Sequence, residues 1–307
     1  MRIGTRRSAL ALAQAKLVAE ELEAQGQGEC ELVPIATSGD SDASVPAPDT
    51  DKSRWVVELE DALSAGKIDL AVHSAKDLPG ELAEGLALLG SPARASAEDV
   101  LCGVAALEQL AQGARVGTSS IRRVAQLRAA REDLDVVSIR GNVDTRLGKL
   151  ANAEEGLDAI VLARAGLQRL GRETEIGGVL DAERFVPAPG QGTLALEGRA
   201  DDERVAEAVL AITDEHALAC LLAERALARE LDASCHTPLG AHAVPGDDGR
   251  LKLRAWVGLP DGSAWVVDEL TGDEDDPEAL GQSVAERMEL AGASQMLEHA
   301  EEMAARP

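Results

Sequence analysis

A short apolar stretch that breaks abruptly into charged residues places the strongest constraint on the fold. In DLAVHSAKDLPG (69–80), the apolar start predicts a buried strand, and His73, Lys76 and Asp77 follow in a turn that ends at a Pro-Gly pair. In an open α/β sheet, residues just past the carboxyl end of a strand face the ligand crevice. The pattern therefore places a carboxylate beside a bound molecule, unless Asp77 only caps the following segment, as aspartates in turns often do.

Strands and helices alternate around this stretch. The sequence predicts strands at 2–5 and 31–36, a helix that begins after Ser8, and a second helix at 55–65. Such βαβ units imply a mainly parallel sheet. The segment RVGT at 115–118 repeats RIGT at the N-terminus, and each is followed by an arginine pair. We therefore expect an α/β protein with two similar, binding-protein-like lobes that face each other.

The last third of the chain follows a different pattern. A Pro/Gly-rich link, FVPAPGQG, precedes a strand at 193–198 that we expect to return to the first lobe, and a long helix is predicted at 214–232. Three strand-like runs joined by Asp-Gly turns come next, and a last helix is predicted at 277–290. This part predicts a smaller α+β domain with an antiparallel sheet. The predicted bounds are 1–94 with 193–212 for the first lobe, 95–192 for the second lobe, and 213–307 for the C-terminal domain.

The composition indicates a globular protein with an unusually acidic balance. Hydrophobic residues make up 45% of the 307 residues, and the net charge is −25, with only six lysines beside 24 arginines. A strongly acidic, lysine-poor chain predicts a halophilic source, with ordinary acidity as the alternative. The same charge argues against nucleic-acid binding, which needs a basic footprint.

Neither the cysteines nor the apolar runs indicate export or a membrane. The four cysteines are widely scattered, no uncharged apolar run reaches the length of a membrane span, and the N-terminus has no apolar signal segment. We therefore expect a cytoplasmic protein that binds no membrane.

Arginines gather in one part of this acidic chain. Between Arg115 and Arg146 there are seven arginines and four acidic residues. Several of these arginines fall at predicted strand exits or helix starts, where a guanidinium group can bind a carboxylate through two hydrogen bonds. With Arg6 and Arg7 on the other lobe, the pattern predicts a crevice for a polyanion. The alternative is that these arginines pair with the acidic surface.

Other common site patterns are absent from the sequence. There is no phosphate-binding G-x-x-x-x-G-K-[ST] loop and no G-x-S-x-G nucleophile elbow, and the five histidines lack metal-ligand spacing. Cys235 lies in a polar loop beside His236, which would favour its thiolate. On these residues alone, an inert surface thiol is the better interpretation of Cys235.

Taken together, several motifs resemble those of the hydroxymethylbilane synthase family, also called porphobilinogen deaminase. They occur in the family's order and cover nearly the whole chain: RIGTRRS (2–8), AVHSAKDLP (71–79), RVGTSSIRR (115–123), IRGNVDTRL (139–147), ARAGLQRLG (163–171), PGQG (189–192) and SCHTPLG (234–240). The resemblance implies three α/β domains and a monomer. It also implies an enzyme of tetrapyrrole (haem) biosynthesis that joins four porphobilinogen molecules head to tail, with release of ammonia, into hydroxymethylbilane.

The resemblance also gives roles to individual residues. Asp77 matches the catalytic carboxylate, and Cys235 matches the cysteine that holds a dipyrromethane cofactor through a thioether. The other matches bind the cofactor (Lys76, Ser120, Arg122, Arg123, Arg146) or the substrate (Arg6, Ser8, Thr118, Ser119, Arg140, Arg169).

Two departures from the family pattern and two rival functions stay open at this point. The segment 39–53, expected to be a lid, is acidic, and Val57 replaces a lysine common in bacterial members, although Lys52 and Trp55 match. The first rival is a non-catalytic two-lobed protein that binds a polycarboxylate. The second is a transferase that uses Cys235 directly as a nucleophile.

Overall fold

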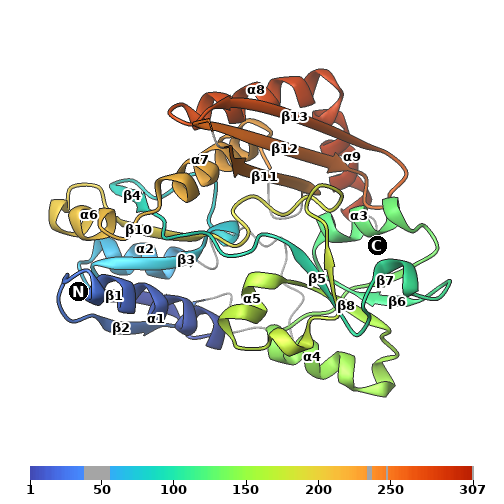
Figure 1. The fold of residues 1–307 in the computed structure, drawn as a ribbon, viewed down its shortest axis with the longest axis horizontal. Coiled ribbons are helices and arrows are strands. Elements are labelled where there is room, and N and C mark those ends of the chain that lie inside the picture. Colours follow the sequence, from blue (N-terminus) through green and yellow to red (C-terminus); the bar gives the residue numbers. More distant parts are fainter. Residues whose placement is uncertain (38–55, 234–236, 247, 306–307) are drawn as a thin grey trace.

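The computed structural model describes residues 1–37, 56–233, 237–246 and 248–305. Two α/β lobes lie side by side, and a C-terminal domain lies above both in the view of Figure 1. The three-part α/β architecture predicted from the sequence is confirmed. The domain boundaries to the residue remain a prediction.

The first lobe is built on a five-stranded sheet in the order β2-β1-β3-β10-β4. Its first three strands are parallel, and β10 runs antiparallel between β3 and β4. The segment after the Pro/Gly-rich link therefore does return to this sheet. The strands are β1 (Arg2–Arg6), β2 (Glu31–Ile35), β3 (Leu70–Ser74), β4 (Leu86–Gly90) and β10 (Leu194–Arg199).

Helices cover both faces of this sheet. Helix α1 (Ala9–Ala24) begins as predicted at Ser8, whose hydroxyl accepts a hydrogen bond from the backbone N–H of Ala11 at 3.3 Å. Helix α6 (Glu203–Leu210) packs with α1 on the core around β3 and β10, and α2 (Val57–Ser64) contributes to a second apolar cluster. Trp55, expected to begin that helix, lies outside the described residues.

The second lobe repeats the plan of the first. Its sheet has the order β7-β6-β8-β5-β9, with β7, β6 and β8 parallel and β5 antiparallel to both β8 and β9. The two lobes thus share an order of three parallel strands followed by antiparallel pairs. The elements are β5 (Asp99–Cys102), β6 (Arg115–Gly117), α3 (Ile121–Ala130), β7 (Asp135–Val137), α4 (Val143–Ala151), β8 (Ala159–Ala163), α5 (Arg164–Arg169) and β9 (Gly178–Leu180).

The C-terminal domain has the predicted antiparallel sheet, in the order β11-β12-β13. Helices α7 and α8 pack together and contribute Leu227, Val284 and Met288 to its core. A further helix, α9, follows a turn at Gly292 and was not predicted. The bounds are α7 (Glu215–Glu230), β11 (Leu239–Pro245), β12 (Arg250–Gly258), β13 (Trp265–Asp273), α8 (Pro277–Leu290) and α9 (Ala293–Ala305).

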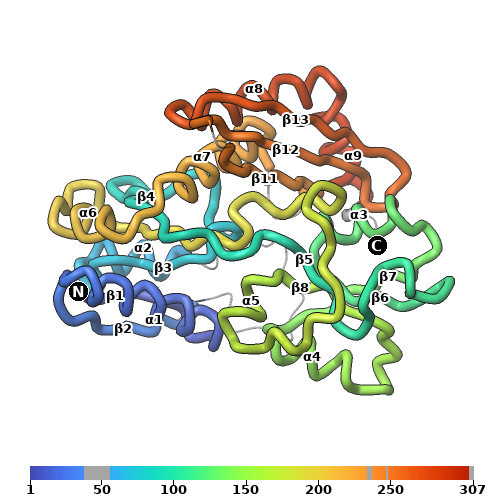
Figure 2. The backbone as a smooth tube through the Cα atoms, viewed as in Figure 1, coloured from blue at the N-terminus to red at the C-terminus, as the bar shows by residue number. Residues whose placement is uncertain are grey.

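Two chain segments, hereafter the crossovers, connect the lobes. The first runs from β4 to β5 and the second from β9 to β10, and Figure 2 shows both passing through the middle of the molecule. The crossovers lie side by side, because the Ala95 N–H donates to the Gly192 carbonyl at 3.2 Å. Arg94 on the first crossover also pairs with Glu224 on α7 at 2.6 Å, which attaches the C-terminal domain to the junction. No helix in the described part of the chain is long and apolar enough to cross a membrane.

Candidate active site

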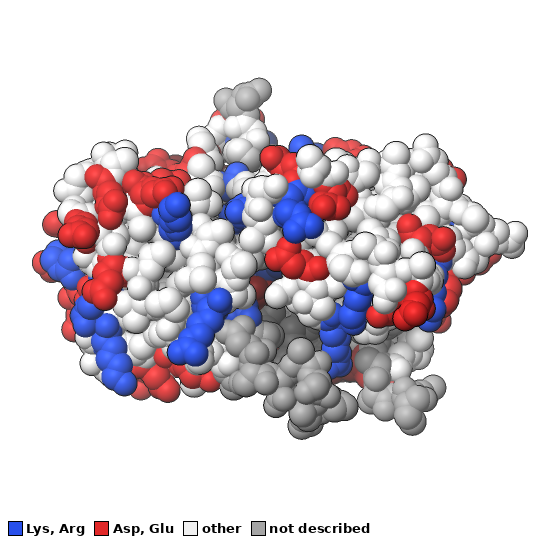
Figure 3. All heavy atoms as spheres, turned by 90° about the horizontal axis from the view of Figure 1, so that it is seen from below, with Lys and Arg blue, Asp and Glu red and all other residues white. Residues whose placement is uncertain are grey.

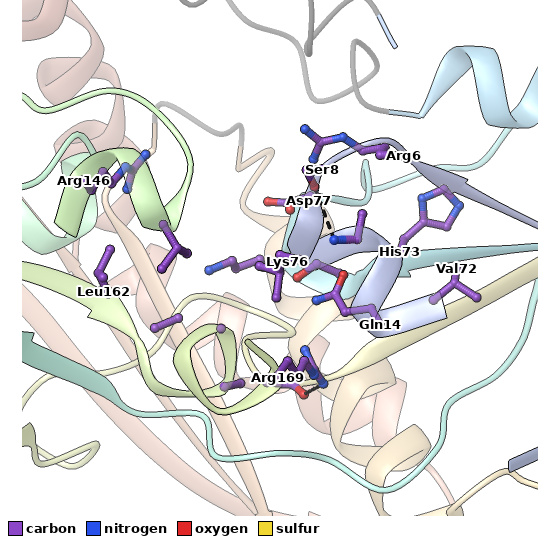
Figure 4. Close-up of a pocket in the computed structure, with 18 of the residues that line it drawn as sticks. Arg6, Ser8, Gln14, Val72, His73, Lys76, Asp77, Arg146, Leu162 and Arg169 are labelled. Atoms are coloured by element: carbon purple, nitrogen blue, oxygen red, sulfur yellow. Dashed lines mark hydrogen bonds between the residues drawn. The ribbon is translucent and has the colours of Figure 1, made fainter. Parts of the chain in front are cut away.

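A pocket of about 140 Å³ lies where the two lobes face each other. Figure 4 shows Arg6, Ser8, Lys76 and Asp77 on the side of the first lobe, and Arg146 and Leu162 on the side of the second. The charged side chains that line the pocket are Arg6, Lys76, Asp77, Arg123, Arg146 and Arg169.

The predicted turn after β3 places both Lys76 and Asp77 at this pocket. The strand ends at Ser74, and a single 3₁₀ turn, η3 (Ala75–Asp77), projects both side chains into the space between the lobes. The backbone N–H of Ala75 is fixed by the carbonyl of Thr193, at 3.0 Å. No helix follows before β4, so the described chain gives Asp77 no helix to cap. This favours the site interpretation of Asp77 over the capping alternative.

Burial makes the cations of this pocket unusual. Burial and the nearby Arg123 lower the pKa of Lys76 to about 8. The same two causes lower the pKa of Arg146 to about 10, and Asp77 partly opposes that change. Burial also lowers the pKa of Arg169 to about 10, and its guanidinium donates to the carbonyl of Gly192 at 2.7 Å. These groups are poorly solvated, so an anionic ligand would relieve the cost of their burial.

Asp99 is a central residue of the site that sequence reasoning missed. Its carboxylate is buried at 1% exposure and accepts hydrogen bonds from Arg122 at 2.8 Å and from Arg123 at 2.7 Å. The only sequence signal was an acid at the start of an apolar run, EDVLC, and nothing there indicated its partners. One buried carboxylate thus holds both members of the arginine pair.

Only one member of the arginine pair lines the pocket. Arg123 lines the pocket, whereas Arg122 is 3% exposed, is absent from the lining and donates to the carbonyl of Val186 at 2.8 Å. The physical reason is that the two residues are adjacent on a helix and point in different directions. The alternative that these arginines pair with acidic residues holds for Arg122 and Arg123, but the partner is the buried Asp99 rather than an acid on the surface.

Several other predicted residues lie outside the pocket lining. Thr118 is buried, Ser119 donates to the carbonyl of Ile139, the N–H of Ser120 donates to the hydroxyl of Thr118 at 3.3 Å, and Arg140 is exposed. All four follow β6 or β7 at one end of the second sheet. Cys235 and the segment 39–53 lie outside the described residues.

Two further residues line the pocket without having been assigned a role. Gln14 on α1 is buried at 4% exposure. His73, which directly precedes the turn, is 5% exposed, and its Nε2 lies 2.9 Å from the carboxylate of Glu197 on β10. Glu197 was not singled out because its partner is far away in the sequence. Among the described residues, no group of three or more His, Cys, Asp or Glu side chains is arranged to hold a metal ion.

The charge of the pocket suits a ligand with several carboxylates. Five cations and one carboxylate line it, although the chain as a whole has a net charge of −25. Figure 3 shows acidic and basic side chains interspersed over the lower face of the molecule rather than one broad basic surface. The positive field is therefore concentrated in the pocket, where low-dielectric walls strengthen it.

Family models and curated proteins of one family match most of the chain. A family model described as "Porphobilinogen deaminase, dipyromethane cofactor binding domain" matches residues 1–207, and one described as "Porphobilinogen deaminase, C-terminal domain" matches 218–289. The porphobilinogen deaminase of Trichlorobacter lovleyi is 43% identical, covering 97% of this chain and 96% of its own. The porphobilinogen deaminase of Xanthomonas axonopodis pv. citri is 46% identical, covering 97% and 98%.

Solved structures with a similar shape are far more distant in sequence. The immunogenic lipoprotein A from Vibrio vulnificus has a TM-score of 0.43 at 13% identity, covering 71% of this chain and 96% of its own. A methionine binding protein also has a TM-score of 0.43, at 14% identity, covering 71% of this chain and 89% of its own. Similarities of this size carry no functional conclusion.

Proposed function

The chain belongs to the porphobilinogen deaminase family, and on that premise we propose that Asp77 is its catalytic carboxylate and that the cations around Asp77 bind the carboxylates of the growing chain. The protein joins four porphobilinogen molecules head to tail into hydroxymethylbilane, and releases ammonia at each step. This reaction belongs to tetrapyrrole biosynthesis. Relatives that are named as deaminases do not favour the rival of a non-catalytic polycarboxylate-binding protein.

The cofactor is dipyrromethane, which the family model names for residues 1–207. When bound, it supplies the pyrrole carbon to which the first substrate is joined. We assign its attachment to Cys235, because the segment SCHTPLG (234–240) matches the cysteine loop of the family. The cationic lining described above fits the carboxylates of such a group.

Binding follows from the charge of the pyrroles. Each unit carries an acetate and a propionate, so each added unit brings two negative charges to the site. The guanidinium groups of Arg123, which is buried, and of Arg146 and Arg169, which are partly buried, can pair with these carboxylates with limited competition from water. In the same proposal, Lys76, Ser120 and Arg122 bind the cofactor with Arg123 and Arg146, and Arg6, Ser8, Thr118, Ser119 and Arg140 bind the substrate with Arg169.

Asp77 acts on the reactive end of the substrate. The C–N bond of the protonated aminomethyl group breaks, ammonia leaves with the electron pair of that bond, and the remaining methylene-pyrrole carries the positive charge. A carboxylate near the pyrrole N–H stabilises this cation until the free carbon of the chain attacks it and a C–C bond forms. The proton lost from that carbon can then pass to Asp77. The observation that carries this role is that Asp77 is the one carboxylate among the described lining residues.

The first prediction concerns Asp77→Ala. Removing a group that stabilises developing charge costs about 3–4 kcal/mol, so we expect turnover to fall by about two to three orders of magnitude. The measurement is formation of hydroxymethylbilane, with the mass of the Cys235 peptide as a second readout. Asp61→Asn, at an exposed carboxylate on α2, is the matched control and should leave turnover unchanged.

Two outcomes separate the parts of this proposal. Wild-type product formation by Asp77→Ala would remove Asp77 from the catalytic role. A Cys235 peptide without a dipyrrole-sized excess would remove the attachment site, and a freely titratable thiol there would support the rival thiol enzyme. We expect the dipyrrole to remain attached in Asp77→Ala, because the cations and the cysteine are unchanged.

The second prediction concerns salt. We propose a cytoplasmic monomer from a halophile that binds neither membranes nor nucleic acid, and the support is a net charge of −25 with six lysines. An acidic surface repels an anionic substrate unless salt screens it, over about 3 Å at 1 M. Activity should therefore rise with added KCl. A rate that is highest in dilute buffer and falls as KCl is added would contradict the halophilic part of the proposal.

A further inference from the structure

Gln191 lies in the second crossover at the point where all three parts of the molecule meet. It is 1% exposed. Its side-chain N–H groups donate to Asp99 at 2.8 Å and to the carbonyl of Ala97 at 2.6 Å, and its side-chain oxygen accepts from Lys76 at 3.4 Å. Its backbone carbonyl accepts from Arg94, which pairs with Glu224 of the C-terminal domain.

The two charged neighbours of Gln191 define the direction of its amide. The oxygen faces an ammonium group, and the nitrogen faces a carboxylate. The reverse orientation would place N–H donors against Lys76 and a lone pair against Asp99, so both contacts would become repulsive. Only a side chain with an acceptor on one side and a donor on the other satisfies this position.

From this geometry we infer that Gln191 is a positioning residue that connects Lys76 of the first lobe to the Asp99–Arg123 pair of the second. This inference rests on the proposed binding roles of Lys76 and Arg123. Asp99 holds Arg123 by bonds to Nε at 3.1 Å and to a terminal nitrogen at 2.7 Å. The relay Lys76–Gln191–Asp99–Arg123 therefore fixes two pocket cations from opposite lobes relative to each other.

The relay also contacts a cation, Lys76, whose protonation is sensitive to its surroundings. Its pKa of about 8 lies close to neutral pH, so small changes in its surroundings alter how much of it is protonated. The oxygen of Gln191 favours the protonated form, because an ammonium group donates to it. The other titratable or charged groups that act on Lys76 or line the same pocket are His73 on β3, Asp77 on η3, Asp99 on β5, Arg122 and Arg123 on α3, Arg6 on β1, Arg146 on α4 and Arg169 on α5.

Two isosteric substitutions separate the two ends of the amide. Gln191→Glu keeps an acceptor for Lys76 and adds a negative charge, but loses both donated bonds. Gln191→Met has nearly the same shape and neither a donor nor an acceptor. Each variant loosens Asp99, so kcat/KM should fall in both by about tenfold to a hundredfold, as small positioning errors do.

The pH dependence should change in opposite directions in the two variants. The alkaline limb of kcat/KM should move up by about one pH unit in Gln191→Glu, because the introduced carboxylate stabilises protonated Lys76. It should move down in Gln191→Met, because Lys76 loses its acceptor. The pH dependence of acylation of Lys76 by acetic anhydride, followed on its peptide by mass spectrometry, should show the same two shifts without relying on turnover.

Gln126→Met is the matched control. Gln126 is also a buried glutamine, at 3% exposure, and donates to the carbonyl of Val186 at 3.0 Å, but it contacts neither Lys76 nor Asp99. It should lower the melting temperature and leave the alkaline limb in place. The inference would be overturned if the alkaline limb of kcat/KM in both Gln191 variants coincided with that of the wild type. It would also be overturned if the limb moved in the same direction in both.

A third variant and the wild type keep the test interpretable. If neither isosteric variant folds, Gln191→Asn keeps the amide but is one methylene shorter, and should lower kcat/KM and move the limb down. Wild-type kinetics in Gln191→Asn would also overturn the inference. The wild-type protein must first show product and the dipyrrole mass on Cys235; failure at that step would count against the proposed function, whereas failure of the limbs to separate would count only against Gln191.

Discussion

At the scale of single residues, the site depends on one buried acid as much as on its many cations. Burial opposes the ionisation of Asp99, but Arg122 and Arg123 outweigh burial and hold its pKa well below the ordinary value of 3.8. The carboxylate is therefore charged at all working pH values. Without it, two arginines would be buried side by side with no counter-charge, which is a costly arrangement.

The third prediction is that Asp99→Asn lowers the free energy of unfolding by about 3–5 kcal/mol at neutral pH, because removing one partner of a buried ion pair leaves the other unpaired. The folded-state pKa of Asp99 is depressed, so its contribution is present above pH 4 and is lost as the pH falls toward the folded-state pKa. Urea unfolding at pH 7 and at pH 3 measures this. The difference between wild type and variant should be smaller at pH 3.

Asp133→Asn is the control for this prediction. Asp133 also pairs with an arginine, Arg131, at 2.7 Å, but its side chain is 26% exposed. Solvent screens such a pair, so the loss of stability should be much smaller than for Asp99→Asn. Equal losses in the two variants would contradict the importance assigned to burial.

At the scale of elements, the turn η3 and the second crossover support each other through a close contact. Gly190 has a φ of +72°, and a Cβ atom there would lie 2.9 Å from the Cβ of Ala75 and 3.1 Å from the backbone nitrogen of Lys76. The crossover thus approaches the backbone of η3 so closely that only glycine fits. The position of Lys76 and Asp77 depends on this contact as well as on the hydrogen bond from Ala75 to Thr193.

The fourth prediction compares Gly190→Ala with Gly26→Ala. Gly26 has a similar φ of +76° but open space around its Cα, so both variants pay a backbone strain of about 1–2 kcal/mol. Only Gly190→Ala also pushes against η3, so only this variant should lose turnover, and its stability should fall by a further 1–3 kcal/mol, roughly. Thermal unfolding and product formation measure the two effects. Equal turnover in both variants would show that η3 tolerates the displacement.

The sequence predicted those elements whose signals are local. The Ser8 cap, the strand before Asp77 and the antiparallel hairpins were found because a few neighbouring residues determine them. Strands β5 and β9 were missed because they are short and their partners lie elsewhere in the chain. The role of Asp99 was missed for the same reason, since it becomes visible only once β5 lies against α3. Roles carried by family motifs, such as that of Asp77, were accessible from the sequence, but the direction in which Arg122 points was not.

At the scale of the whole molecule, one carboxylate joins the C-terminal domain to both crossovers. Glu224 is fully buried and accepts from Arg94 with both oxygens, from the N–H of Gly190 at 2.6 Å and from the N–H of Ala243 at 2.7 Å. Each oxygen therefore serves one guanidinium nitrogen and one backbone N–H. Both oxygens must be acceptors, because each of them accepts two hydrogen bonds.

The fifth prediction is that Glu224→Gln loosens the junction. Either orientation of the new amide places an N–H₂ group against a backbone N–H, so the free energy of unfolding should fall by about 3 kcal/mol. Limited proteolysis should cut the crossovers sooner than in the wild type. Glu278→Gln, at an exposed carboxylate on α8 that pairs with Arg229 on α7 at 2.9 Å, should show neither effect. A resistant junction in Glu224→Gln would assign the attachment of the domain to its apolar contacts instead.

The place of β10 between β3 and β4 has a consequence for how the protein folds during its synthesis. A ribosome releases the whole second sheet before β10 emerges, so the lobe that starts first is completed last. Until then β3 and β4 have no strand between them, and the carbonyl of Thr193 that fixes Ala75 does not yet exist. The second lobe, with its pocket arginines, can therefore fold early, whereas the turn that carries Asp77 reaches its final position late. The site becomes reactive only after most of the polypeptide has been made.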